Sequence, residues 1–502
     1  MASARTYSIA VTGIDGHLVE IEADIGQGLS SVNTTAGPYA ALHEARGRVR
    51  AAIANTAGAA WPDGRIVLAL SPPTPPKVGG VHDLALAAAI LAAASAVPSR
   101  RLASTVLLGE LALDGRLRPV RGILPAVQAA RDAGFSTVVV PQATLAEAGL
   151  ATGVDVFGAC DLRAVLDWLR GEGVLLEPAT ETAPDTVGNY GDLSEVPGHD
   201  EARWAMEVAA AGGHALRLSG PEGVGKVMLA QRLSGLLPPL TESESLQVTA
   251  IHSMAGTLPD TKAQITEPLY VTAHHSTSVA ALIGGGVSAR PGAISRAHLG
   301  VLHLDFYEEF NATVLEALRN PLEDGEVRIA RRDGVIRYPA QILLVLTGSV
   351  CPCDAARDTD CTCSPLTLRR HRARLRGPVA DRIDLSVRMF PQDRSSFSDV
   401  AAESSAVVRE RVAAARVAAA SRWHDESATT NSQVPTRALR QFPLSQKAIE
   451  PIKSALRLGQ ISPRGAERTI RVAWTICDLR GGERPTVEDL TQALNFRHIA
   501  TR

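Results

Sequence analysis

The sequence predicts an α/β protein made of two successive α/β regions and a helical region at the end. Short strands and Ala-rich helices fill residues 1–172, and strands and helices alternate again over 193–385, which is the pattern of a parallel sheet. Ala- and Arg-rich helical segments fill 386–502. Between the first two regions, a polar stretch with two prolines and no apolar periodicity predicts a linker over 173–192.

The composition is that of a multidomain globular protein, since 502 residues with 45% hydrophobic residues can form several cores. The 51 basic and 53 acidic residues nearly cancel, so any basic surface must be local. The first residues lack the apolar segment of a signal peptide, and residues 84–96, the most apolar stretch, are too short to cross a bilayer and predict a buried helix. Six cysteines do not form a secreted disulfide framework, so we expect a cytoplasmic protein.

The strongest local motif is a glycine-rich loop between a strand-like segment, 214–219, and a helix-like segment that follows it. Backbone amides of such a loop can surround phosphates, and its lysine can reach the terminal ones. The alternative, a glycine-rich turn without a ligand, fits the flanking strand and helix less well. The residues predicted to bind nucleotide are Gly220, Pro221, Glu222, Gly223, Val224, Gly225, Lys226 and Val227.

The last residue of this loop departs from the P-loop motif. The motif has Ser or Thr there, because that hydroxyl ligates Mg²⁺, and Val227 cannot coordinate a metal. Further along, the apolar segment 300–305 ends in Asp305, the form of a Walker B strand, and this carboxylate could hold Mg²⁺ directly or through water. The alternative is a core strand that ends in an exposed aspartate. Glu308 and Glu309 follow and are expected to point elsewhere.

A cysteine cluster lies within the second α/β region. Its two C-x-C pairs, separated by a hydrophilic loop, predict a structural Zn²⁺ site with four thiolate ligands; reduced thiols or a redox pair are the alternative. Four protein ligands leave no open position, so catalysis by this metal is not expected. The ligands are Cys351, Cys353, Cys361 and Cys363.

Long segments across nearly the whole chain carry a resemblance to a known family. They include GELALDGRLRPVRGILPA, ARPGAISRAHLGVLHLD, VLEALRNPLEDGEV, RGPVADRIDL and ISPRGAERTIRVAWTICDL. On these segments the chain resembles the ComM/YifB family, the magnesium-chelatase-like branch of the AAA+ ATPases. The resemblance implies a Lon-protease-like domain over 1–172, a P-loop AAA+ core with a parallel sheet over 193–385 and a C-terminal helical lid over 386–502.

This chain departs from the family at the place where the γ-phosphate, the metal and the attacking water would lie. The Walker B glutamate is Phe306 and the sensor-1 asparagine is Ser349. We therefore expect nucleotide binding that is weak or independent of Mg²⁺ and turnover that is slow or absent, unless neighbouring groups substitute. Further departures from family motifs are Glu267, Tyr270, Ala273 and Ala293.

Other functional residues of the family are retained. Lys226 and Asp305 are present, Arg382 resembles the arginine finger supplied to a neighbour's nucleotide, and Arg464 resembles the sensor-2 arginine. An arginine finger accelerates hydrolysis only where water and metal are positioned. The resemblance thus implies catalytic roles for Asp305, Arg382 and Arg464.

The Lon-like region lacks the catalytic pair of Lon proteases. Alignment with the Lon pattern places Val81 where the serine nucleophile belongs and Leu124 where the lysine belongs. Neither side chain can perform the reaction. We expect a scaffold or interaction surface there, and no peptidase.

The resemblance implies a ring of six subunits that contacts DNA. Residues 327–337 predict a β-hairpin with an Asp-Gly turn, and in related motors such a hairpin reaches into the pore and contacts DNA phosphates, here through Arg331 and Arg332. A stretch of five arginines over 369–376 is at least as well explained by a solvated or intersubunit surface.

Three functions remain open at this point. ComM relatives resemble helicases that drive branch migration during recombination of incoming DNA, with recombination proteins as partners. A non-hydrolysing protein that binds DNA or a partner would keep the same surfaces without the motor. A magnesium-chelatase subunit rests on the fold alone.

Overall fold

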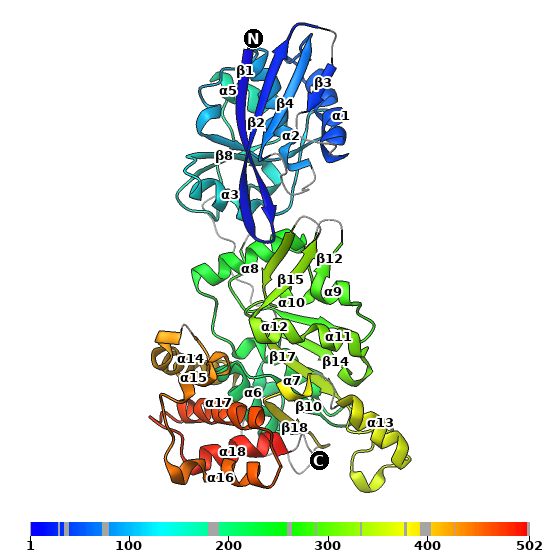
Figure 1. Cartoon of the computed structure of the whole chain (residues 1–502), viewed down its shortest axis with the longest axis vertical. Helices are drawn as coiled ribbons and strands as arrows, with labels where there is room; N and C mark the ends of the chain where they lie inside the picture. Colours follow the sequence, from blue (N-terminus) through cyan, green and yellow to red (C-terminus); the bar gives the residue numbers. More distant parts are fainter. Residues whose placement is uncertain are drawn as a thin grey trace.

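The computed structural model of the chain describes residues 2–28, 31–34, 40–72, 80–178, 190–258, 264–286, 289–331, 334–375, 379–391, 403–426 and 428–498. The molecule is elongated, with the N-terminal α/β region at one end, the second α/β region below it and the helical region beside the lower part of the second region (Figure 1). Most of the predicted linker, residues 179–189, lies outside the described residues. In the described part of the chain, no helix is both long and apolar enough to cross a membrane.

The N-terminal region is built on a seven-stranded mixed sheet in the order β3-β4-β2-β1-β5-β8-β9. The first two strands form a long antiparallel hairpin, and β5, β8 and β9 run parallel to β1. Every residue of α2 is buried, which confirms the core helix predicted from the most apolar stretch. The elements are β1 (Ala2–Thr12), β2 (Asp15–Gly26), β3 (Ser31–Thr34), α1 (Ala40–Asn55), β4 (Arg65–Ser71), α2 (Asp83–Ala93), β5 (Thr105–Leu107), β6 (Glu110–Leu111), β7 (Leu117–Arg118), α3 (Ile123–Asp132), β8 (Thr137–Pro141), α4 (Leu145–Ala148), β9 (Asp155–Ala159) and α5 (Leu162–Arg170).

The second region has a five-stranded sheet in the order β11-β14-β17-β10-β18, and every neighbouring pair is parallel. This confirms the predicted α/β fold with a parallel sheet. The apolar strands β14 and β17 lie inside the sheet, where both faces are covered. The elements are α6 (Asp200–Gly212), β10 (Leu216–Ser219), α7 (Lys226–Arg232), α8 (Glu242–Ala255), β11 (Tyr270–Ala273), α9 (Val279–Ile283), β12 (Gly284–Gly285), β13 (Arg290–Pro291), α10 (Ala293–Arg296), β14 (Val301–Asp305), α11 (Ala312–Ala317), α12 (Arg319–Asp324), β15 (Glu326–Arg331), β16 (Gly334–Pro339), β17 (Leu343–Gly348), α13 (Pro365–Leu375) and β18 (Leu385–Arg388).

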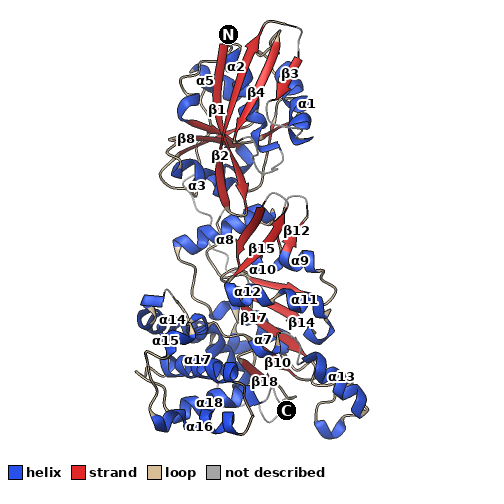
Figure 2. Cartoon of the chain, viewed as in Figure 1, coloured by secondary structure: helices blue, strands red, loops and turns tan. Residues whose placement is uncertain are grey.

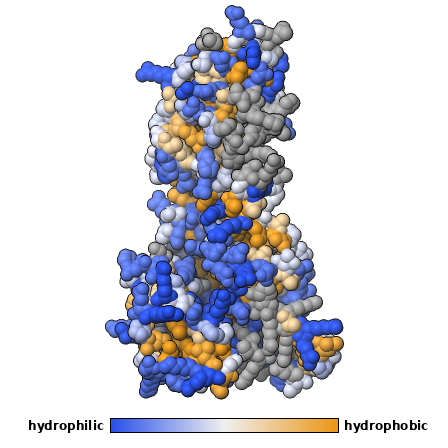
Figure 3. Space-filling model, in the orientation of Figure 1, coloured by the Kyte–Doolittle hydropathy of each residue, from blue (hydrophilic) through white to orange (hydrophobic). Residues whose placement is uncertain are grey.

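The hairpin predicted over 327–337 is formed by β15 and β16, which pair antiparallel. It meets the turn between β1 and β2, since a Cβ atom added to Gly13 would lie 2.5 Å from the carbonyl oxygen of Arg337. Ile14 and Ile336 both pack against the core of the second region. Figure 3 shows hydrophobic residues where the two α/β regions meet. One side of the hairpin is therefore in contact with the N-terminal region.

The third region is helical after β18 and packs against the end of the second sheet where that strand lies (Figure 2). Residues 386–388, predicted to belong to the helical region, are instead part of β18. Its aromatic core contains Trp423 and Trp474, whose rings meet edge to face with centroids 5.8 Å apart. The guanidinium of Arg422 lies 4.3 Å from the ring centroid of Trp474, where a cation–π contact adds to the packing. The elements are α14 (Ser405–Arg422), α15 (Thr436–Leu439), α16 (Gln446–Arg457), α17 (Pro463–Leu479) and α18 (Val487–His498).

A buried polar network joins the helical region to the second sheet at Asp384, just before β18. Arg468 of α17 donates to Asp384 Oδ1 at 2.7 Å. His214 lies with Nδ1 3.4 Å from Asp384 Oδ2 and with Nε2 2.8 Å from the hydroxyl of Thr475, also on α17. Burial alone would raise the pKa of Asp384, but Arg468 and His214 outweigh burial and hold that pKa well below its usual range.

We expect Asp384→Asn to lower the free energy of unfolding by about 2–3 kcal/mol at pH 7, because the partly buried Arg468 loses its carboxylate. Urea denaturation followed by tryptophan fluorescence measures the change. Because the pKa of Asp384 is lower in the folded state, its full contribution to the free energy of unfolding is present above the pKa of an unfolded aspartate, about 3.9. This contribution is lost as the pH falls through the pKa of the folded state. The difference between the two proteins should therefore shrink below about pH 4.

Asp132→Asn is the matched control, because it removes an exposed carboxylate that pairs with Arg131 at 2.8 Å. This change should cost less than about 1 kcal/mol. Equal denaturation midpoints for wild type and Asp384→Asn at pH 7 would contradict the role of this network.

Candidate nucleotide-binding site

The predicted glycine-rich loop lies between β10 and α7, at the carboxyl end of the parallel sheet. Gly223 and Gly225 have φ angles of 73° and 97°, a left-handed conformation that favours glycine. The residue that follows, Lys226, is the first of α7. The local structure is thus the strand–loop–helix arrangement that a P-loop requires.

Lys226 is held inside the loop. Its side chain is buried, and Nζ donates hydrogen bonds at 2.7 Å to the carbonyl oxygens of both Gly220 and Pro221. Burial lowers the pKa of Lys226, and nearby carboxylates oppose that shift, with the largest such effect coming from Asp354. The lysine is therefore directed at the cradle in which the phosphates of a nucleotide would lie.

Asp305 ends β14, as the Walker B interpretation requires, and receives two hydrogen bonds. The Thr347 hydroxyl donates to Asp305 Oδ1 at 2.6 Å, and the Phe306 amide donates to the same oxygen at 3.1 Å. Asp305 also contributes to the electrostatic environment of Lys226. The structure therefore brings together the loop lysine and the strand carboxylate predicted from the sequence.

A chain of hydrogen bonds runs across three strands to Asp305. Tyr270 Oη lies 2.5 Å from His303 Nδ1, and His303 Nε2 lies 2.7 Å from Thr347 Oγ1. Because Thr347 donates to Asp305, it must accept from His303 Nε2–H, and Nδ1 then accepts from the tyrosine hydroxyl. Burial lowers the pKa of His303 to about 4, so the imidazole is neutral at pH 7 and fits this direction.

Glu308 faces the site, and the expectation that it points elsewhere was wrong. It is buried, and its Oε1 accepts a hydrogen bond from the Ser349 amide at 2.7 Å. Its Oε2 is buried without a hydrogen bond to any described residue, and burial raises the pKa of this carboxyl. Glu308 points into the site because the chain turns directly after β14 at Phe306, whose φ is 50°. Glu309 is exposed, as expected.

Two of the residues that replace family motif residues lie at this edge of the sheet, and one further residue joins them. Val227 is partly exposed in the first turn of α7 and offers no oxygen to a metal. Ser349, at the sensor-1 position after β17, donates through its hydroxyl to Asp354 Oδ1 at 3.2 Å. Asp354 Oδ2 in turn accepts a hydrogen bond from the P-loop amide of Glu222 at 2.6 Å. Sequence reasoning missed Asp354, although its position directly after the first C-x-C pair was the available signal.

The arginine predicted to act on a neighbour's nucleotide lies at the other edge of the sheet. Arg382 precedes β18 and is buried in an ion pair with Glu323, whereas the P-loop follows β10. Because β10 and β18 are parallel, these positions are at opposite ends of the strands. Arg464 is exposed in the first turn of α17, next to Gly465, which approaches Arg497. The structure does not bring Arg382 to the P-loop of its own chain.

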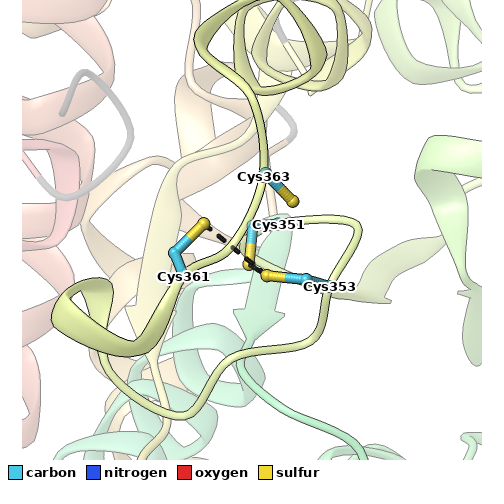
Figure 4. A group of neighbouring side chains, drawn as sticks. All are labelled: Cys351, Cys353, Cys361 and Cys363. Atoms are coloured by element: carbon cyan, nitrogen blue, oxygen red, sulfur yellow. Dashed lines mark hydrogen bonds between the residues drawn. The ribbon is translucent and has the colours of Figure 1, made fainter.

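The four cysteines of the predicted metal site converge in the loop that follows β17 (Figure 4). Their sulfur atoms all lie within 4.8 Å of one another. Cys351 Sγ is 3.3 Å from Cys353 Sγ, and Cys353 Sγ is 3.6 Å from Cys361 Sγ, so these sulfurs are not covalently bonded. Tetrahedral Zn²⁺ with sulfur ligands at about 2.3 Å needs neighbouring sulfurs about 3.8 Å apart, and this donor set fits that ion.

The residues predicted to contact DNA are only partly described. Arg331 donates to the carbonyl oxygen of Gly286, and Arg332 lies outside the described residues. On the same hairpin, Arg328 and Arg337 both pair with Glu326. Residues 369–375 of the arginine-rich stretch lie in α13, where Arg369 and Arg370 are exposed and His371 is buried; Arg376 lies outside the described residues. This helix projects from the core (Figure 1).

The Lon-like catalytic positions are filled by core residues. Val81 and Leu124 are both buried and pack in one hydrophobic cluster of the N-terminal region. Neither side chain offers a nucleophile or a base at these positions.

Comparisons with known proteins cover the whole chain. Residues 192–397 match the family model "Magnesium chelatase, subunit ChlI", residues 21–144 match "Subunit ChlI of Mg-chelatase" and residues 402–497 match "Magnesium chelatase, subunit ChlI C-terminal". A protein of Mycobacterium tuberculosis is 53% identical over 504 residues, with 100% of both chains covered. Lon protease 2 of Bacillus subtilis is 28% identical over 113 residues, which are 22% of this chain and 19% of that one.

Two relatives carry the names that the sequence motifs indicate. YifB of Escherichia coli is 35% identical over 503 residues, and competence protein ComM of Haemophilus influenzae is 35% identical over 504 residues. Each alignment covers 99% of this chain and 98% of the relative. The chain therefore belongs to the ComM/YifB family of magnesium-chelatase-like AAA+ proteins.

Proposed function

We propose that this chain binds ATP at its P-loop and acts as a cytoplasmic, ring-forming AAA+ protein on DNA, with slow or absent hydrolysis. The observation that supports binding most directly is the buried Lys226 in a strand–loop–helix motif beside Asp305. The name of the relative ComM connects the family with competence, and ComM-type proteins resemble helicases of branch migration. The proposed setting is therefore recombination of incoming DNA, alone or with recombination proteins.

The replaced residues support slow or absent hydrolysis. Val227 offers no hydroxyl to Mg²⁺, and Phe306 offers no carboxylate to polarise water. A bound nucleotide would be held by the loop amides and Lys226, with Asp305 left as a ligand for the metal. Mg²⁺ bound there would neutralise phosphate charge and orient the nucleotide.

The position of Arg382 supports an assembly. It lies away from the P-loop of its own chain, where an arginine that acts on a neighbour's nucleotide would be placed. A closed ring, which we propose to be hexameric, would bring the edge that carries Arg382 to the next P-loop. In this arrangement each nucleotide lies between two subunits.

The proposed DNA contact is the β15–β16 hairpin with Arg331 and Arg332. Such contacts would go to phosphates and would weaken as salt rises, without reading sequence. The hairpin also touches the N-terminal region, so DNA bound there would meet both α/β regions.

The second candidate function is a non-hydrolysing protein that binds DNA or a partner. It is favoured by the acidic surroundings of Lys226, where Glu308 and Asp354 join Asp305 while the groups that position metal and water are replaced. The two candidates differ in whether ATP turnover exists and whether DNA stimulates it.

We expect steady-state ATP hydrolysis with Mg²⁺ and branched DNA to be no greater for the wild-type protein than for Lys226→Ala. Restoring the missing groups in the double variant Val227→Thr, Phe306→Glu should raise turnover by roughly tenfold or more, because a positioned metal ligand and general base are regained. Phosphate release measures both rates.

The matched control is Met228→Thr combined with Phe306→Glu, since Met228 is the exposed neighbour of Val227 on α7. This control places the new hydroxyl one position away and should not reproduce the gain. Wild-type turnover well above Lys226→Ala would contradict slow hydrolysis and favour the motor. If neither wild type nor Lys226→Ala binds nucleotide in a direct binding assay, the proposal of ATP binding is contradicted.

We also propose that the four-cysteine cluster holds one structural Zn²⁺. Protein purified without chelator should contain about one zinc per chain, and the double variant Cys361→Ser, Cys363→Ser should lose it. Cys160→Ser is the control, because Cys160 is exposed and outside the cluster. Elemental analysis decides the question, and metal-free protein whose cysteines form disulfides would favour the redox alternative.

A further inference from the structure

The carboxylate of Asp354 lies in the cradle formed by the P-loop. Oδ2 accepts a hydrogen bond from the Glu222 amide at 2.6 Å, and Oδ1 accepts one from the Ser349 hydroxyl at 3.2 Å. One oxygen thus meets the P-loop, and the other meets the sensor-1 position at the end of β17. A P-loop amide is a donor to nucleotide phosphates, so an anion of the protein already occupies one of these donors.

We propose that Asp354 is an internal competitor for nucleotide phosphate, so that a nucleotide must displace this carboxylate from the P-loop to bind. The inference rests on the proposed function, in which the loop binds nucleotide. Asp354 would then set the affinity of the P-loop for its ligand. That ligand would be a phosphate ester with a negatively charged terminal phosphate.

Electrostatics support the competition. Asp354 exerts the largest charge effect on Lys226, ahead of Asp305 and Glu308. The same lysine must neutralise the terminal phosphates of a bound nucleotide. Since an aspartate carboxylate and a phosphate carry charge of the same sign, both cannot be held next to Lys226 without repulsion.

The backbone holds Asp354 in this position. Its φ of 53° is left-handed, a conformation that aspartate tolerates better than most residues. Its amide donates to the Cys351 carbonyl oxygen at 3.0 Å, in the turn that also carries Cys353. The cysteine cluster therefore fixes the loop from which Asp354 reaches the nucleotide site, and Ser349 supplies the second contact.

The test is the affinity of the full chain for a fluorescent ATP analogue, measured by anisotropy with and without Mg²⁺. Asp354→Asn keeps the side-chain shape and the left-handed backbone but removes the charge. Asp354→Gly removes the carboxylate and suits the positive φ. Both should bind the analogue about tenfold more tightly than wild type, the change expected when a competing charged hydrogen bond is lost.

The matched control is Asp360→Asn, which removes an exposed carboxylate from the same loop. It should leave the affinity unchanged within about twofold. Thermal denaturation of each variant tests whether the fold is retained. Because asparagine and glycine at position 354 place different demands on the backbone, the same effect from both would be due to the lost charge.

The outcomes separate this inference from the proposed function. Tighter binding by both Asp354 variants and not by Asp360→Asn supports the competitor. Equal or weaker binding by the Asp354 variants overturns it while nucleotide binding stands. If neither wild type nor any variant binds the analogue at any tested concentration, and Lys226→Ala gives the same result, the nucleotide-binding proposal is overturned. The inference then falls with it.

Discussion

The parallel pairing of β10, β17 and β14 is the constraint on which the rest of the site depends. Since these strands run in the same direction, the residues that follow each of them must meet at one edge of the sheet. The P-loop, Ser349 and Asp305 are brought together in this way although they are far apart in the sequence. The same direction places Arg382, which precedes β18, at the opposite edge.

Stability of this edge of the sheet and the groups needed for hydrolysis rest largely on different side chains, with Asp305 common to both. The strands are held by apolar packing and by the hydrogen-bond chain from Tyr270 through His303 and Thr347 to Asp305. Full coordination of the metal and activation of the water depend also on the side chains at positions 227 and 306, which contribute little to the hydrophobic core. The fold can therefore be kept intact while the groups for hydrolysis are replaced, and family membership alone does not determine turnover.

Much of this architecture could be predicted from the sequence because it is encoded locally. The strand–loop–helix around Lys226, the β15–β16 hairpin and the cysteine cluster each follow from spacing within a short segment. Glu308 and Asp354 could not be placed that way. The direction of Glu308 depends on the left-handed turn at Phe306, and that of Asp354 depends on how a loop after β17 closes back onto the P-loop.

The charges around Lys226 link the stability of the P-loop to its affinity for a ligand. A buried ammonium is costly unless carboxylates or carbonyl oxygens compensate it. Here the loop carbonyls accept its hydrogen bonds, and Asp354 exerts the largest favourable charge effect. If Asp354 competes with phosphate as proposed, the carboxylate that stabilises Lys226 also opposes nucleotide binding, and substitutions that strengthen one are expected to weaken the other.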